Sequence, residues 1–415
     1  MINICIFEDQ GYKNLMPLTQ LKPSYLLLVG TDTLFEKIFR FFSYANITMH
    51  CRPELKPILK TKIPKLSINR INTGAPCLFI NGRVLFDQKL FNEIASLNKN
   101  QSHLLVYKGN IVAAYLRDKN LDYFKDTLEN VPNSQDLINH LRTNCVAKEL
   151  KTINMINNLW DLLSLNPQTI VSDFENKKQP GIIKGEIKPF TAIYNENNVF
   201  IEKGTVVEDF VTINAEHGPV YIEKNAYIES GSRLEGPLFI GQNTRILGGR
   251  ISSCSIGTNC KVSGEMSNSI MLNYSNKAHT GFIGHSYIGE WVNLGAGTTT
   301  SNLKNTYGSV SIDNGTDTIK TNQTFFGSII GDHTKTGINT TLNTGTIISY
   351  GCNIFGLGLH DKFIPAFSWG SPQKYTNYDL AKFFEIEQKM MARRSKKLEL
   401  FEKEIITETN KIIKS

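Results

Sequence analysis

Between about residues 199 and 354 the sequence repeats with a period of six. Aliphatic side chains recur at every sixth position over long stretches, and Gly, Asn or Ser occupy many positions between them. The repeated aliphatic residues are Ile222, Ile228, Leu234, Ile240, Ile246, Ile288, Leu294, Ile330, Leu342, Ile348 and Ile354. Six residues form one short strand and one tight corner, so three units close a triangular coil whose aliphatic side chains point inward. Stacked coils pair their strands at about 4.8 Å, and only a continuous stack buries the apolar side. An ordinary antiparallel sheet would give a period of two, so the pattern predicts a parallel β-helix.

Length and composition limit the remaining possibilities. A chain of 415 residues is long enough for at least two domains. Its seven cysteines include no CxxC pair, which argues against a disulfide framework and a thiolate zinc site. The N-terminus has no basic leader, and no stretch approaches the ~20 apolar residues that span a bilayer. We therefore expect a soluble, cytoplasmic protein.

The net charge of +7 does not indicate a nucleic-acid partner. Lys and Arg are scattered among Asn, Asp and Glu, and even the most basic stretch, residues 393–397, is followed by three glutamates. Such a pattern is typical of a solvated helix face. We expect small-molecule partners and neither nucleic acid nor membrane.

Residues 1–130 alternate between strand-like and helix-like segments. Ile2–Phe7 has the composition of a buried strand, and Thr33–Tyr44 that of an amphipathic helix opened by a capping box of Thr33 and Glu36. Residues 103–107 and 111–116, separated by Lys-Gly-Asn, predict a hairpin. This region is predicted to be an α/β domain.

The rest of the chain divides by its patterns. The predicted domains are 1–130, the α/β domain; 131–186, a helical connector; 187–368, the β-helix; and 369–415, a helical extension. The polar stretch from Asn302 to Gln323 is too poor in aliphatics for a coil and should project as an arm. In the extension, apolar residues spaced by seven predict one helix, with half of a coiled-coil seam: Phe384, Met391, Leu398, Ile405 and Ile412.

One segment of the repeats carries chemistry. It runs from Lys277 through His279 to Asn302 and contains Gly295-Ala296-Gly297. A histidine suits the removal of a proton from an amine that attacks a thioester, and backbone N–H groups at small-residue corners suit the developing oxyanion. Glycines would let a pantetheine arm approach the backbone. The segment indicates acyl transfer from acetyl-CoA to an amine.

Two other interpretations of these histidines remain open. An isolated His in a repeat is commonly a surface residue at a corner, which is how we interpret the other seven histidines. His285, six residues after His279, could instead share a metal with it, but neither His333 nor His360 supplies a convincing third ligand.

At these residues the sequence resembles a known family. KAHTGFIGHSYIGEWVNLGAGTTTSN, starting at Lys277, and IIGDHTKTGINTTLNTGTIISYGCNIFG, starting at Ile329, are similar to the acetyltransferase region of the bifunctional N-acetylglucosamine-1-phosphate uridyltransferase/glucosamine-1-phosphate N-acetyltransferase family. The resemblance covers most of residues 199–360. It implies a left-handed β-helix and a homotrimer with active sites between subunits, where His279 faces the arm of another chain.

The same resemblance implies roles for individual residues. His279 would be the general base, Lys277, Phe282, Asn293 and Asn302 would bind the substrate, and Ala296 would contact coenzyme A. Phe282 stands where the family has a sugar-contacting tyrosine. Ser267 stands in the stretch where the family usually has a lysine, and the loss of that phosphate contact would allow a different acceptor.

The N-terminal resemblance is weaker. The segment Leu15-Met16-Pro17-Leu18-Thr19, followed by Lys22, is similar to the sugar-phosphate nucleotidyltransferase pattern, which implies that Lys22 binds nucleotide phosphate. The glycine-rich loop is replaced by a segment containing Glu8 and Asp9, whose carboxylates repel phosphates unless Mg²⁺ bridges them. Either Asp9 and Glu8 hold Mg²⁺, or the domain is structural or regulatory.

The leading hypothesis is acetyl-CoA-dependent N-acetylation of glucosamine-1-phosphate or a related amino-sugar phosphate, in the synthesis of UDP-N-acetylglucosamine for the cell envelope. Uridylyl transfer by the N-terminal domain could accompany it. Two alternatives stay open: a non-catalytic or metabolite-sensing scaffold that binds nucleotide sugars, and a protein whose main activity is nucleotidyl transfer.

Overall fold

The computed structural model describes residues 2–72, 74–128 and 131–414. The chain forms two compact units. The first comprises Met1–Leu27, Asp32–Leu159 and Glu399–Ile406, and the second comprises Leu28–Thr31, Trp160–Leu398 and Thr407–Ser415. In the described part of the chain, no helix is both long and apolar enough to cross a membrane.

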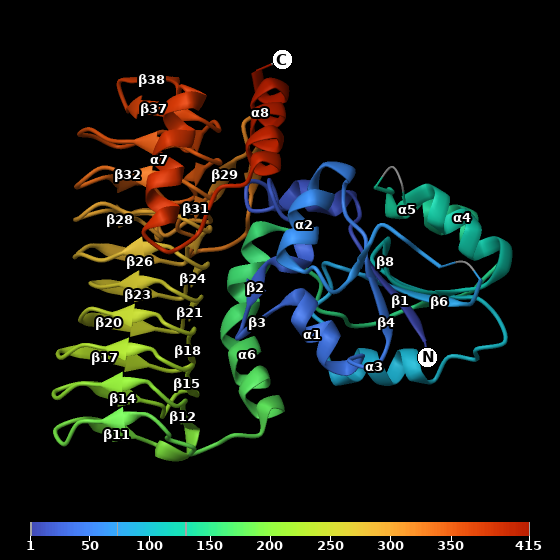
Figure 1. Ribbon diagram of the computed structural model, residues 1–415, viewed down its shortest axis with the longest axis horizontal. Coiled ribbons are helices and arrows are strands. Elements are labelled where there is room, and N and C mark those ends of the chain that lie inside the picture. The colour runs from blue at the N-terminus through green and yellow to red at the C-terminus, as the bar shows by residue number, and fades with distance from the viewer. Residues whose placement is uncertain (1, 73, 129–130, 415) are drawn as a thin grey trace. The chain divides into compact units, whose positions relative to one another are not determined.

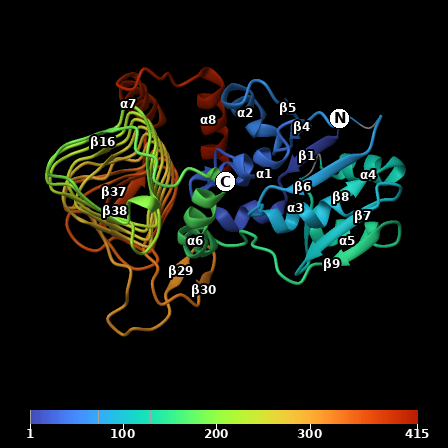
Figure 2. The same cartoon turned by 90° about the horizontal axis from the view of Figure 1, so that it is seen from below.

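The first unit contains a seven-stranded mixed sheet (Figures 1 and 2). In spatial order its strands are β5 (Ser67–Ile68), β4 (Asn46–Met49), β1 (Asn3–Phe7), β6 (Cys77–Asn81), β8 (Asn110–Leu116), β7 (His103–Tyr107) and β9 (Val146–Glu149). Its helices are α1 (Leu34–Phe41), α2 (Lys56–Lys62), α3 (Gln88–Ala95), α4 (Asp118–Leu128) and α5 (Ser134–Leu141). Strand β1 is parallel to β4 and β6, whereas β8 is antiparallel to β6 and β7.

The helix and the hairpin predicted for this unit are confirmed, although the ends of the helix and of the strands differ from the prediction by at most a few residues. The capping box of Thr33 and Glu36 is formed and starts α1, which ends at Phe41 rather than Tyr44. The predicted hairpin is β7 and β8. One core cluster packs apolar residues of α4 and α5 against the sheet, with Phe124 between Phe7 and Phe79.

Two-residue strands and short 3-10 helices connect these elements. They are η1 (Gln10–Leu15), η2 (Ser24–Leu26), β2 (Leu28–Val29), β3 (Asp32–Thr33), η3 (Pro53–Leu55) and, within the first coil of the second unit, η4 (Glu196–Asn198).

The second unit is a stack of triangular coils, seen end-on in Figure 2. Its first face contains β10 (Glu186–Ile187), β13 (Val206–Val207), β16 (Tyr227–Ile228), β19 (Arg245–Ile246), β22 (Lys261–Val262), β25 (Asn276–Lys277), β32 (Lys335–Thr336), β35 (Asn353–Ile354), β37 (Ser368–Ser371) and β38 (Lys374–Asn377). Its second face contains β11 (Ala192–Tyr194), β14 (Thr212–Asn214), β17 (Ser232–Glu235), β20 (Gly249–Ser252), β23 (Glu265–Ser267), β26 (Phe282–Gly284), β28 (Thr299–Thr300) and β33 (Thr341–Leu342). Its third face contains β12 (Val199–Ile201), β15 (Val220–Ile222), β18 (Leu238–Ile240), β21 (Ser255–Ile256), β24 (Ile270–Met271), β27 (Tyr287–Ile288), β31 (Ile329–Ile330), β34 (Ile347–Ile348) and β36 (Phe363–Ile364). We call the turn from the first to the second face the first corner, and the turn from the second to the third face the second corner.

The period of six is confirmed as the cause of this fold. All eleven aliphatic residues of the repeat lie in one buried cluster that runs along the axis of the stack. Apart from the final β37–β38 hairpin, neighbouring strands of each face are parallel and in register. The predicted combination of an α/β domain and a parallel β-helix is therefore correct.

Helix α6 (Leu159–Lys177) lies along the third face. Its Phe174 packs with a column of aromatic residues on that face, Phe200, Tyr221 and Phe239. The amide oxygen of Asn166 accepts hydrogen bonds from the backbone N–H of Gly30 and the hydroxyl of Ser255, both at 2.8 Å. These contacts fix the helix against the coils.

The predicted arm leaves the stack after Asn302 and carries a small hairpin of β29 (Ser311–Asp313) and β30 (Thr318–Lys320). Figure 2 shows it projecting from the coils. The backbone N–H of Phe326 donates to the carbonyl of Asn302 at 2.9 Å, which closes the base of the arm.

The C-terminal segment differs from the single predicted helix. It forms α7 (Leu380–Ala392) and α8 (Leu400–Lys414), because Ser395 adopts a φ of +53° and the N–H of Lys396 returns to the carbonyl of Met391, a common way to end a helix. The apolar spacing of seven does not mark one continuous seam, since Phe383 and Ile406 are buried rather than their neighbours Phe384 and Ile405. The side chain of Ile412 lies outside the described residues.

An ion-pair cluster joins α7 to the first face. The carboxylate of Glu387 is fully buried and pairs with His333 Nδ1 at 2.5 Å and with Lys335 Nζ. Burial opposes its charge, but the two partners outweigh that effect and lower the pKa of Glu387. The helix is therefore held by charge as well as by apolar packing.

Candidate functional site

His279 lies at the first corner, directly after β25, with its side chain exposed. The neighbouring coil places Ala296 at the same corner: the N–H of Gly297 donates to the carbonyl of Thr280 at 3.0 Å. The proposed base and the proposed coenzyme A contact thus lie in consecutive turns of one corner.

Lys277 does not occupy the position expected of a substrate ligand. It pairs in register with Val262, so its side chain points into the coil, and only 1% of the residue is exposed. Its ammonium donates to the backbone carbonyls of Ser263 at 3.0 Å and His279 at 2.7 Å. Burial lowers the pKa of Lys277 to about 8. The prediction that Lys277 contacts the substrate does not fit this geometry, because the side chain instead fixes the corner that carries His279.

The glycines around Ala296 also have a different cause from the one expected. A Cβ atom on Gly295 would lie 2.4 Å from the carbonyl oxygen of Gly337, and one on Gly297, whose φ is +76°, would lie 2.1 Å from the side chain of Asn339. Both glycines are therefore required by close stacking of adjacent coils. Ala296 itself remains half-buried at the surface of the corner and fits a ligand contact.

Asn293 lies on the first face with its side chain exposed, bridged by its backbone to Asn276 on one side and Lys335 on the other. Arg394 donates to the side chain of Asn276 at 3.0 Å, and Glu387 pairs with Lys335. Asn293 is thus an accessible amide flanked by two side chains that are already bound.

Phe282 and Asn302 come together on the second face, over Gly284. A Cβ atom on Gly284 would lie 2.5 Å from the Phe282 ring and 2.6 Å from the Asn302 amide nitrogen. Only glycine leaves room for both. Ser267, which stands in the stretch where the family usually has a lysine, pairs in register with Gly284. The predicted acceptor-binding residues of this face therefore lie together.

Sequence reasoning underestimated His285, which lies at the second corner beside Asn302. Its Nδ1 and the Asn302 amide nitrogen are 2.9 Å apart. The positive φ of His285, +45°, fits a corner, where His and Asn are more common than other residues. His279 and His285 occupy opposite ends of β26 and different corners, which does not fit a shared metal ion. Among the described residues, no group of three His, Cys, Asp or Glu could hold one.

The predicted site residues thus fall into two groups. His279 and Ala296 share the first corner, with Asn293 on the adjoining first face, whereas the side chain of Phe282, from the start of β26, meets Asn302 over Gly284. Strand β26, which begins at Phe282 and is about 10 Å long, separates the first corner from Asn302 and His285 at the second corner. One chain therefore presents two separate half-sites.

In the first unit, Asp9 faces an arginine. Its two carboxylate oxygens accept from Arg83 Nε and Nη2, each at 2.7 Å, and both residues are 2% exposed. Asn81 and Ser134 also donate to Asp9. Burial opposes the charge, but Arg83 outweighs it and lowers the pKa of Asp9. These contacts do not fit a Mg²⁺ ligand, since a guanidinium already holds both oxygens.

The other residues of this edge are similarly enclosed. Glu8 pairs with Arg52 at 3.1 Å, and burial, partly offset by Arg52, raises the pKa of Glu8 to about 7. Lys22, the predicted phosphate ligand, is 2% exposed. The edge of the sheet where nucleotides bind in α/β proteins is therefore filled by the chain's own side chains.

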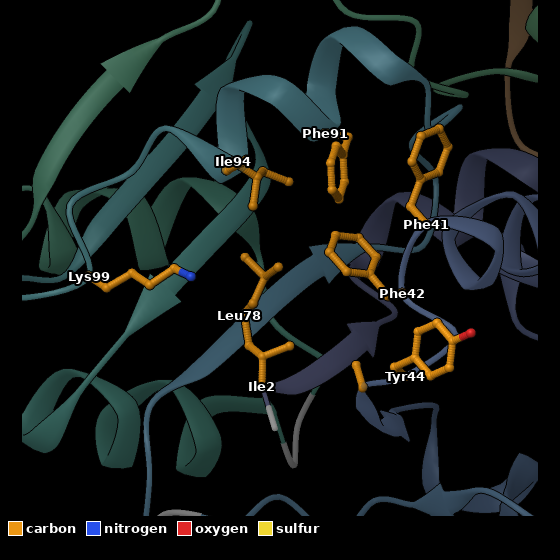
Figure 3. A pocket seen from close by; sticks show the side chains of 10 residues that line it. Ile2, Phe41, Phe42, Tyr44, Leu78, Phe91, Ile94 and Lys99 are labelled. Carbon is orange, nitrogen blue, oxygen red and sulfur yellow. The ribbon is translucent and has the colours of Figure 1, made fainter.

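A pocket in the first unit lies elsewhere. About 390 Å³ in volume, it is lined by aromatic and aliphatic side chains (Figure 3). The lining includes Ile2, Phe41, Phe42, Leu78 and Phe91, with Lys99 at one side. Ile2 precedes β1 whereas Asp9 follows it, so this pocket is at the opposite end of the sheet from the predicted nucleotide edge.

Parts of both units are similar in sequence to known proteins. Residues 4–179 match a family model described as sugar nucleotidyl transferase. The bifunctional sugar-1-phosphate nucleotidylyltransferase/acetyltransferase of Sulfurisphaera tokodaii is 33% identical over 171 residues, which are 39% of this chain and 40% of that protein. Two proteins named bifunctional protein GlmU match over longer stretches: that of Methanococcus aeolicus is 27% identical, covering 80% of this chain and 88% of its own, and that of Methanococcus vannielii is 26% identical, covering 85% and 76%. These matches confirm the resemblance predicted from the sequence, and their names are those of transferases, the predicted class of enzyme.

Proposed function

We propose that this chain, which carries a sugar nucleotidyl transferase domain at residues 4–179 and is similar over most of its length to bifunctional GlmU proteins, is an acetyl-CoA-dependent N-acetyltransferase. Its acceptor is glucosamine-1-phosphate or a related amino-sugar phosphate, and its product feeds nucleotide-sugar synthesis. The observation that carries this proposal is the exposed His279 at a corner shared with Ala296, in a chain whose sequence is similar to that of a protein named as an acetyltransferase.

The reaction needs a base, an acyl donor and an amine. The acceptor's amine nitrogen attacks the thioester carbonyl, and His279 takes the proton that this nitrogen loses. The C–S bond then breaks, the new C–N bond remains as an amide, and the coenzyme A thiolate takes up a proton. The corner of residues 295–297 lies one coil away and provides backbone beside the reacting groups. Lys277 acts only indirectly, by holding the backbone of His279.

The separation of the two half-sites supports assembly into a homotrimer. We propose that His279 and Asn293 of one subunit meet Phe282 and Asn302 of another, because within one chain the Phe282 side chain meets Asn302 over Gly284, whereas His279 is exposed at the first corner. Exposed apolar residues continue the first corner in the coils beyond Ala296: Ile338 is 71% exposed and Leu357 is 79% exposed. A neighbouring subunit would cover them.

The test is release of thiol from acetyl-CoA with glucosamine-1-phosphate and a small panel of other amino sugars. We expect release that His279→Ala abolishes without changing the oligomeric state. The matched control is His217→Ala, at a loop far along the stack. A fully active His279→Ala protein would refute the role assigned to His279. Absence of thiol release with every amino sugar of the panel would favour a non-catalytic sugar-binding scaffold.

Sugar-1-phosphate nucleotidyl transfer, including uridylyl transfer, is the second candidate, because residues 4–179 match that family. The buried pairs of Asp9 with Arg83 and Glu8 with Arg52 would have to open before a Mg²⁺-bound nucleotide could reach this edge. Magnesium-dependent release of pyrophosphate from UTP and N-acetylglucosamine-1-phosphate, surviving His279→Ala, would establish this activity. Its absence in a protein that still releases thiol would leave acetyl transfer alone.

A further inference from the structure

A pocket of about 510 Å³ opens at the second corner, between α6 and the base of the arm. Helix α6 contributes Trp160, Leu163, Ser164 and Pro167, the coils contribute Asn268 and His285, and the returning arm contributes residues 322–326. Its volume lies within the roughly 300–1,000 Å³ typical of small-molecule sites. All of its lining belongs to the second unit.

His285 is the most constrained polar group of this pocket. Its Nδ1 lies 2.9 Å from the Asn302 amide nitrogen, its ring stacks on Phe325 with centroids 5.2 Å apart, and its carbonyl accepts from the N–H of Gly327 at 2.8 Å. It is therefore fixed to both ends of the arm. Because Nδ1 accepts from the amide, the proton of the neutral ring is on Nε2, which makes Nε2–H a donor. Burial lowers the pKa of His285, which favours this neutral form at pH 7.

The chemistry of the lining selects an uncharged, hydroxyl-rich ring. Aromatic faces are supplied by Trp160 and Phe325, and amide groups by Asn268, Asn322 and Gln323. None of the described residues that line the pocket is an acid, a lysine or an arginine. Aromatic rings pack against the C–H face of a pyranose, and amides exchange hydrogen bonds with its hydroxyls. A charged ligand would find no oppositely charged acid, lysine or arginine among the described lining residues.

We propose that this pocket binds a hexopyranose ring without a charged substituent facing its walls, with His285 as the residue that sets specificity. The ring could belong to a free neutral sugar or be the sugar part of the phosphorylated acceptor, whose phosphate would remain outside. The inference deepens the proposed function, since Asn302 joins the pocket to the Phe282 half-site.

The experiment is calorimetric titration of the full-length protein with N-acetylglucosamine and, separately, with glucosamine-1-phosphate. Phe325→Ala removes the stacking partner of His285; because Phe325 is 48% exposed, this variant should fold normally. His285→Asn keeps a polar residue that tolerates the positive φ. We expect each change to raise Kd at least tenfold. Phe190→Ala, an exposed aromatic residue at the other end of the stack, is the matched control and should leave Kd unchanged.

The two sources give different results. Binding of N-acetylglucosamine that both variants weaken identifies a neutral sugar site, whereas weakened binding of glucosamine-1-phosphate alone identifies the acceptor's ring. Absence of binding by both sugars, or binding that neither variant weakens, overturns the proposal. The result is independent of catalysis, because the titration is done without acetyl-CoA, and thiol release could persist even if this pocket binds nothing.

Discussion

Replacing Lys277 by methionine should change how stability depends on pH. The lysine is 1% exposed and its pKa falls from 10.5 to about 8 because of burial. At roughly 1.4 kcal/mol for each pH unit, this fall corresponds to an upper limit of roughly 3.5 kcal/mol. Below pH 8 the residue is charged in both states, and the full cost of burying the charge opposes folding. Between pH 8 and 10.5 the folded protein loses the proton while the unfolded chain keeps it, so stability rises with pH.

The variant lacks this rise. At pH 7 Lys277→Met avoids burying a charge but leaves the carbonyls of Ser263 and His279 without the ammonium, at a cost of about 1 kcal/mol each. We therefore expect the two proteins to be within about 1–2 kcal/mol at pH 7, and the unchanged protein to gain up to roughly 3 kcal/mol on the variant by pH 10.5. Such a gain is a relative shift in Tm of roughly 6–12 °C.

The measurement is Tm of both proteins at intervals from pH 7 to pH 10.5, with Lys224→Met, at an exposed corner, as the matched control. Only the difference between each variant and the unchanged protein is compared, because other groups titrate equally in both. A difference that stays constant for Lys277→Met would refute the buried, low-pKa lysine. In the assay of thiol release, the variant should also lose about tenfold in kcat, which is ~1.4 kcal/mol, because the backbone of His279 has lost a hydrogen-bond donor.

Two further changes test other contacts. Gly284→Ala would place a Cβ atom 2.5 Å from the Phe282 ring. We expect the KM of the amino-sugar acceptor to rise about tenfold, which is roughly 1.4 kcal/mol. The control is Gly308→Ala, whose Cβ atom would have its nearest neighbour 3.7 Å away and which should leave KM unchanged. Glu387→Gln removes the buried carboxylate that Lys335 and His333 contact and should cost about 3–5 kcal/mol near neutral pH, seen as a lower Tm. Because the pKa of Glu387 is lowered in the folded state, its contribution is present above 4.5 and is lost as pH falls through the lowered value. Glu385→Gln on the same helix removes an exposed pair and should change Tm little; equal effects of the two glutamine variants would contradict the role of burial.

The architecture of the second unit could be predicted because one local rule generates all of it. Each sixth residue must fill the axis of the coil, so the inward positions are visible in the sequence as aliphatic residues. The arm could be predicted for the same reason, because residues 302–323 lack that filling. The inward position of the Lys277 side chain could not be predicted, because the rule requires an apolar residue there. The two groups that accept from Lys277 are backbone carbonyls, which no side-chain pattern identifies.

The spatial grouping of the site residues was harder to predict from the sequence than the residues themselves. The motif lists His279, Phe282 and Asn302 within one stretch, which suggests a single site. The side chains of Phe282 and Asn302 nevertheless meet over Gly284, whereas His279 is at the first corner. His285, which joins the second group, has no pattern that distinguishes it from a surface histidine. Spacing along the chain therefore identified the chemistry but not which residues share a half-site.

The N-terminal acids illustrate how burial changes the meaning of a residue type. Glu8 and Asp9 next to each other look like metal ligands when their partners are unknown, yet each has an arginine 44 or 74 positions away as its partner. A pair such as Asp9 and Arg83, 2% exposed on both sides, persists only because each charge compensates the other, and removing either would leave an uncompensated charge in the interior. The same residues cannot also offer free oxygens to Mg²⁺ without first displacing the guanidinium. Any nucleotide chemistry of this unit therefore has to begin with a rearrangement of these pairs, whereas His279 of the β-helix is already exposed.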